Sequence, residues 1–159
     1  VDVNNALDGE GPFSPERSGT LPAGQLIEAC FCGNFIEDEV RRMVTGEGGL
    51  VAYLNTNSMK EIVDFAEDGD EECRFYVEAF VYQVAKAIGE MAVVLEGEVD
   101  AILLTGGIAY SSLIARSVTE KIKFISTVVV YKGEDELASM AMNAQLMLSG
   151  ELVPKKYPH

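Results

Sequence analysis

A chain of 159 residues, of which 48% are hydrophobic and 24% charged, is long enough for one domain with a hydrophobic core and has a globular composition. The formal net charge of -14 argues against binding to nucleic acid. Any phosphate would have to be bound by backbone N–H groups, by single cations such as Arg17 or Lys60, or by a metal held on acidic side chains. No apolar run reaches the ~18 to 20 residues of a membrane span and the first residues do not form a secretory signal, so we expect a soluble cytoplasmic protein without a membrane segment.

The N-terminal part of the chain places one cation among turn-forming residues. Residues 1–5 are predicted to be the end of a strand, and the Gly- and Pro-rich residues 7–19 surround Arg17. Apolar spacing then predicts helices over residues 23–32 and 37–44, and a third that begins near Ser58, where Glu61 would complete a capping box. Three cysteines and one terminal His supply too few ligands for zinc, so the thiols are expected to be buried or half-buried.

The longest helical pattern covers residues 70–95. Its apolar residues recur at spacings of three and four, which predicts a stripe wide enough to be covered by other elements. These residues are Phe75, Val77, Phe80, Val81, Val84, Ile88, Met91 and Val94. We therefore expect a central packing helix.

The C-terminal half alternates strand and helix. "DAILLTGG" and "FISTVVVY" are predicted to be strands buried on both faces, and residues 110–121 and 134–148 to be helices, which is typical of a parallel α/β sheet. In such sheets ligands bind beyond the carboxyl ends of the strands, where "LLTGGIAYSS" lies. From the residues alone, the Gly106-Gly107 pair indicates either a ligand that approaches the backbone or only a tight turn.

Three segments together resemble the C-terminal half of butyrate kinases, which are relatives of the acetate kinases in the actin and sugar kinase superfamily. They are "DVNNALDGEGPFSPERSGTLP", "GGLVAYLNTN" and "DAILLTGGIAYS", in this order and spacing. The resemblance implies a ribonuclease H-like α/β domain, a mixed sheet flanked by helices, over residues 1–159. It further implies that the first β-hairpin of this domain and the whole N-terminal domain are absent.

The activity implied by the resemblance is the reversible, ATP-dependent phosphorylation of butyrate, or of a related short or branched acid, to an acyl phosphate with Mg²⁺. The chain alone is expected to be inactive. The partners implied are the carboxylic acid, ATP or ADP, the N-terminal domain and a second copy in a homo-oligomer. The alternative is a noncatalytic nucleotide-binding or interaction domain that retains the fold.

The resemblance also assigns roles to single residues. Arg17 matches the catalytic Arg of the "R-S-G" turn, which would hold the transferring phosphoryl group; the alternative is a surface Arg paired with Glu16. The nucleotide-binding turn is matched by Gly106, Gly107 and Ile108.

Two further nucleotide contacts and a metal site follow from the same resemblance. Ser111 matches a residue near the adenosine, and Lys60 matches a residue beside the adenine, although it could equally be a solvated helix charge. "GEDEL" resembles a magnesium-linked segment and points to Asp135 and Glu136 as ligands. The alternative is that these acids only stabilise the dipole of the following helix.

Overall fold

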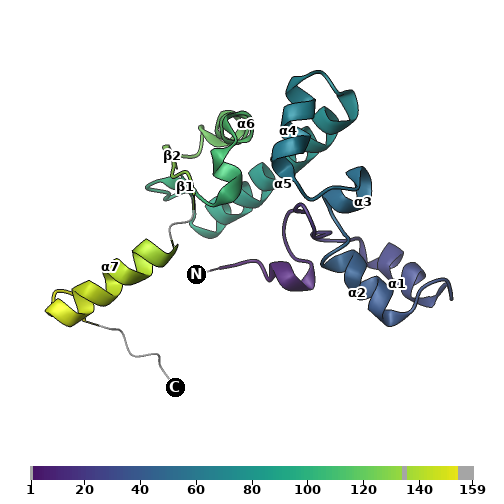
Figure 1. The fold of residues 1–159 in the computed structure, drawn as a ribbon, viewed down its shortest axis with the longest axis horizontal. Helices are drawn as coiled ribbons and strands as arrows, with labels where there is room; N and C mark the ends of the chain where they lie inside the picture. The colour runs from purple at the N-terminus through teal and green to yellow at the C-terminus, as the bar shows by residue number, and fades with distance from the viewer. Residues whose placement is uncertain (1, 134–135, 154–159) are drawn as a thin grey trace.

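The computed structural model describes residues 2–133 and 136–153, which form mainly helices and one small sheet (Figure 1). The helices are α1 (Ala23–Phe31), α2 (Glu37–Val44), α3 (Leu50–Leu54), α4 (Met59–Glu67), α5 (Glu71–Val94), α6 (Ser112–Ile122) and α7 (Glu136–Ser149), with short 3-10 helices at Ala6–Asp8 and Gly107–Tyr110. The strands are β1 (Ile102–Leu104) and β2 (Val128–Val130).

The core lies where α5 packs between α4 and α6 (Figure 1). Helix α4 buries Met59, Ile62, Val63 and Ala66, which recur at spacings of three and four and therefore share one face. Helix α5 buries Cys73, Val77, Phe80 and Val81, and α6 buries Ile114, Val118 and Ile122. The prediction of a central packing helix is confirmed. Its apolar stripe is not covered near either end of the helix, since Phe75 is 63% and Val94 46% exposed.

The sheet consists of two parallel strands, in the register Ile102↔Val128 to Leu104↔Val130. The connection between them is α6, as strand–helix–strand alternation predicts. The expectation that both strands are buried on both faces is wrong, because Leu103 is 60% exposed. Within the described residues helices cover one face of the sheet, and the side chain of Leu103 points to the other face.

Patterns among neighbouring residues predicted the longer helices accurately, but they did not predict the short helix α3 or the details of the cap of α4. The predicted helix boundaries agree with α1, α2, α5 and α6 to within two residues. The short helix α3 was not expected, because five residues carry too little periodicity. The capping box at α4 is only half formed: Ser58 Oγ accepts from Glu61 N at 3.3 Å, whereas the Glu61 carboxylate accepts from Thr56 Oγ1 at 3.2 Å.

Two N-terminal expectations are corrected. Residues 2–5 form no strand, and Val3 is 85% exposed, because no neighbouring strand pairs with them within the described residues. Cys30 and Cys32 are exposed at the end of α1 instead of half-buried, while Cys73 is buried, and its burial raises the pKa of its thiol. No helix of the described ranges is long and apolar enough to cross a membrane.

Candidate nucleotide site

A cavity of about 500 Å³ lies between α4 and the turn that follows β1. One wall comes from α4 and the other from the 3-10 helix Gly107–Tyr110 and the start of α6. The lining residues are Met59, Lys60, Val63, Asp64, Glu67, Gly107, Ile108, Tyr110, Ser111 and Ser112. Four of the five residues predicted to contact nucleotide, Lys60, Gly107, Ile108 and Ser111, therefore line one cavity.

The α4 wall carries charged side chains of both signs. Lys60, Asp64 and Glu67 are exposed and recur at spacings of four and three, so they lie along one face of the helix. The opposite face holds the buried Ile62 and Ala66. Sequence reasoning missed Asp64 and Glu67, although the helical repeat starting from Lys60 would have found them.

The two glycines of the turn play different parts. Gly106 has φ 88° and ψ 179°, a conformation that is essentially restricted to glycine, so the tight-turn interpretation holds for this residue. Gly107 needs no such freedom, since its φ is not positive, and a Cβ built on it would meet no atom within 4 Å. Because Gly107 lines the cavity, its missing side chain leaves room for a ligand to approach the backbone.

Ile108 and Ser111 also have structural roles. The side chain of Ile108 is half-buried against the core. Ser111 is the N-cap of α6, and its Oγ accepts from Ile114 N at 3.3 Å. The Ser111 hydroxyl hydrogen can still be donated towards the cavity.

The end of β2 is tied to the same turn. Gly106 and Gly133 form an isolated antiparallel bridge, and Thr105 Oγ1 donates to Gly133 O at 3.4 Å. The ring of Tyr110 lies over Gly133, where a Cβ would overlap with the Tyr110 hydroxyl. The segment that leads towards the predicted metal ligands therefore starts beside the nucleotide turn.

The predicted metal ligands, Asp135 and Glu136, follow β2 in the chain. Asp135 lies outside the described residues, and of Glu136 only its place as the first residue of α7 is described. Among residues 2–133 and 136–153, no group of three or more His, Cys, Asp or Glu side chains could hold a metal.

The backbone around Arg17 is held by hydrogen bonds on both sides. Arg17 N donates to Ser14 Oγ at 3.1 Å, and Ser14 N donates to Arg17 O at 3.0 Å. Ser18 N donates to Val44 O at 3.0 Å, beside an antiparallel bridge between Arg17 and Thr45. The half-buried Arg17 is therefore presented by a fixed turn rather than by a loose loop.

The start of helix α3 is hydrogen-bonded to this turn. Leu50 N donates to Ser14 O at 3.2 Å and Val51 N to Pro15 O at 2.9 Å, so carbonyls of the turn satisfy the free N–H groups at the start of α3. Gly49, with φ 59°, is so close to the turn that a Cβ would overlap with Ser14 O.

The Arg17 side chain does not pair with Glu16. Of the residues that the structure describes, none forms a hydrogen bond or ion pair with the Arg17 guanidinium. The Glu16 carboxylate instead accepts from Asn57 Nδ2 at 2.5 Å. The pairing of Arg17 with Glu16 that the alternative interpretation assumed is therefore not formed, and the catalytic role of Arg17 stays a prediction.

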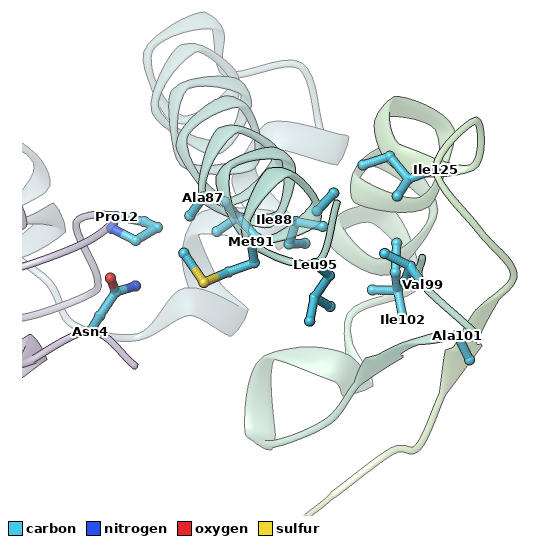
Figure 2. A pocket seen from close by; sticks show the side chains of 12 residues that line it. Asn4, Pro12, Ala87, Ile88, Met91, Leu95, Val99, Ala101, Ile102 and Ile125 are labelled. Carbon is cyan, nitrogen blue, oxygen red and sulfur yellow. The ribbon is translucent and has the colours of Figure 1, made fainter. Parts of the chain in front are cut away.

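A second cavity of about 350 Å³ is apolar and separate from the first (Figure 2). Ile88 and Met91 of α5 and Leu95 directly after it face Val99 and Ile102 across this cavity, with Ile125 beside them and Asn4 and Pro12 at the far side. It shares no lining residue with the first cavity.

Comparison with solved structures establishes the class of fold. The acetate kinase from Entamoeba histolytica superimposes with a TM-score of 0.74 at 16% identity, covering 88% of this chain and 44% of that chain. A propionate kinase from Francisella tularensis subsp. tularensis SCHU S4 gives 0.69 at 22% identity, covering 82% and 39%. The fold is thus that of the acetate and propionate kinases, which confirms the predicted fold class.

The sequence identifies the family. The model of the acetokinase family matches residues 10–145, and the chain belongs to this family. It is 54% identical over 157 residues to a probable butyrate kinase from Clostridium botulinum (strain Alaska E43 / Type E3), which is 99% of this chain and 44% of that relative. The chain thus spans less than half the length of the curated relatives it matches, and the resemblance inferred from the sequence is confirmed.

Proposed function

We propose that this chain is the C-terminal, nucleotide-binding half of a carboxylate kinase, which transfers the γ-phosphoryl group of ATP reversibly to butyrate or a related short-chain acid. The observation that carries the proposal is the cavity lined by Lys60, Gly107, Ile108 and Ser111. The acid is proposed from relatives named butyrate kinase that are 54% identical to this chain.

The charges of the cavity indicate how a nucleotide would lie in it. The carboxylates of Asp64 and Glu67 repel phosphates but can accept hydrogen bonds from ribose hydroxyls or an amino group. The base and ribose therefore belong beside α4. The phosphates would extend past Gly107 and out of the cavity.

Arg17 would stabilise the phosphoryl group in transit. A carboxylate oxygen of the acid attacks the γ-phosphorus, the bond from phosphorus to the ADP oxygen breaks, and no proton has to move because the acid is already ionised. The equatorial oxygens carry the charge in the transition state, and the planar guanidinium offers them a fixed fork of donors.

The acidic segment that follows β2 has the type of side chain that Mg²⁺ prefers. The bridge between Gly106 and Gly133 brings the residue directly before "EDE" beside the turn that follows β1, and magnesium prefers one or two carboxylates together with phosphates and water. Asp135 and Glu136 would hold the ion, which would neutralise phosphate charge.

The whole protein would include a second half that binds the carboxylic acid, so the isolated chain is expected to be inactive. We propose that the complete enzyme is cytoplasmic and associates as a homo-oligomer. These features rest on the resemblance to the family.

Calorimetry with MgADP tests the nucleotide site. Gly107→Val should weaken binding at least ~10-fold, because Gly107 lines the cavity, a Cβ built on it would meet no protein atom within 4 Å, and its backbone conformation does not require glycine. Gly24→Val is the matched control, since Gly24 also has open space around it and lies on α1. Equal affinity of both variants for MgADP would contradict the site.

Complementation tests the reaction. Co-expression with the N-terminal domain of a butyrate kinase should restore ATP-dependent formation of acyl phosphate, and Arg17→Ala should lower kcat by about 10³-fold, the scale of a transition-state arginine. MgADP binding together with no acyl phosphate formation would favour the noncatalytic nucleotide-binding alternative.

A further inference from the structure

The Arg17 guanidinium would be expected to pair with a carboxylate in so strongly acidic a chain. The chain has 26 acidic residues, and the nearest in sequence is the adjacent Glu16. Even so, the described part of the chain supplies no ion pair or hydrogen bond to this guanidinium. Something in the fold must therefore keep the neighbouring carboxylate engaged elsewhere.

That carboxylate is engaged by Asn57. Glu16 is fixed twice, because its backbone O accepts from Gly46 N at 2.8 Å and its Oε1 accepts from Asn57 Nδ2 at 2.5 Å. Asn57 lies in the segment directly before α4, and Met59 and Lys60 at the start of that helix line the nucleotide cavity. The bond between Glu16 and Asn57 thus joins the Arg17 turn to the wall of the cavity.

We propose that Asn57 is a positioning residue that holds the Glu16 carboxylate away from Arg17 and so keeps the guanidinium free for the transferring phosphoryl group. This inference rests on the proposed phosphotransferase function. A carboxylate released beside Arg17 would compete with phosphate for the same guanidinium donors and would repel the phosphate itself.

The proposal predicts an unusual relation between two substitutions. In the complemented enzyme, Asn57→Ala should lower kcat/KM for acyl phosphate with ADP about fivefold, the scale of one exposed Arg–carboxylate pair. Glu16→Ala should have little effect, because it removes the competitor. The double variant should match Glu16→Ala, so that loss of the carboxylate rescues loss of the amide.

A purely structural tether predicts a different result. If the bond only held the two segments together, Asn57→Ala, Glu16→Ala and the double variant would all lose activity to the same extent. That pattern would overturn the proposal, as would wild-type activity of Asn57→Ala. The control is Asn34→Ala, which removes an exposed amide that has no hydrogen-bond partner within the described residues.

A second pair of variants covers the case in which Asn57→Ala fails to fold. Asn57→Asp places two carboxylates in contact. Adding Glu16→Gln restores a hydrogen bond with donor and acceptor exchanged, because the new amide at position 16 can donate to the new carboxylate at position 57. Rescue of Asn57→Asp by Glu16→Gln is expected, and absence of rescue would contradict the proposal.

NMR on the isolated chain separates this inference from the proposed function. The Arg17 Nε–Hε signal should shift in Asn57→Ala, as the guanidinium gains a carboxylate partner, and return to its original position in the double variant. An unchanged signal overturns the inference. Inactivity of the complemented wild-type enzyme, in contrast, would count against the proposed function alone.

Discussion

At the scale of single residues, close packing around the Arg17 turn explains why glycine stands at position 49. Gly49 adopts φ 59° and ψ -135° directly before α3, and a Cβ would overlap with Ser14 O. Both the backbone conformation and the space exclude a side chain. The turn that presents Arg17 therefore depends on the absence of one methyl group.

Gly49→Ala should destabilise the folded chain by at least about 2 kcal/mol, because a strained φ adds to a steric overlap. Gly33→Ala, at φ 77° with nothing within 4 Å, should cost only ~1 kcal/mol, the strain alone. Urea unfolding of the two variants measures the difference. Equal midpoints would show that Ser14 does not restrict position 49.

At the scale of elements, α5 begins at a capping carboxylate. Asp70 Oδ1 accepts from Cys73 N at 2.8 Å, and this backbone hydrogen bond lowers the pKa of Asp70 below its ordinary value of 3.8. The ionised side chain also interacts favourably with the helix dipole. Because the unfolded chain binds the proton more tightly, the ionised form stabilises the fold above about pH 4, and this contribution is lost as the pH falls through the lowered value.

Asp70→Asn should flatten the pH dependence of stability. An Asn side chain still caps the helix but does not titrate, so wild type should exceed the variant at pH 7, and the gap should narrow below pH 4. Urea midpoints between pH 3 and pH 7 measure the gap. Asp100→Asn is the control, because Asp100 lies outside any helix. This substitution should leave the pH dependence of the urea midpoint that arises from Asp70 unchanged.

At the scale of the whole molecule, apolar surface is exposed at two places. The first is the open face of the sheet, where Leu103 is 60% exposed. The second is α7, which extends away from α1 to α5 (Figure 1) and carries Leu137 at 80% and Leu148 at 90% exposure. Exposed apolar surface of this extent promotes association.

The isolated chain should therefore self-associate as its concentration rises. Light scattering should show species larger than 17.2 kDa, and Leu103→Glu together with Leu148→Glu should reduce them. A monodisperse monomer over the whole concentration range would contradict this prediction.

Much of the fold and part of the site could be predicted from the sequence because they depend on local patterns. The stripe of Val77, Phe80 and Val81 predicted a central helix, and the Gly106-Gly107 pair after an apolar run predicted a turn at a strand end. Lys60 and Ser111 were placed at the nucleotide through resemblance, and the cavity brings them together with Gly107.

Only the tertiary structure decided which partners these residues meet. The sequence by itself determined the longer helices, the order of β1, α6 and β2, and the family, because these features depend on patterns among neighbouring residues. It did not reveal that Glu16 bonds to Asn57 rather than to Arg17, or that one face of β1 is open. Contacts between residues far apart in sequence form only when packing brings their elements together, and no local pattern contains that information.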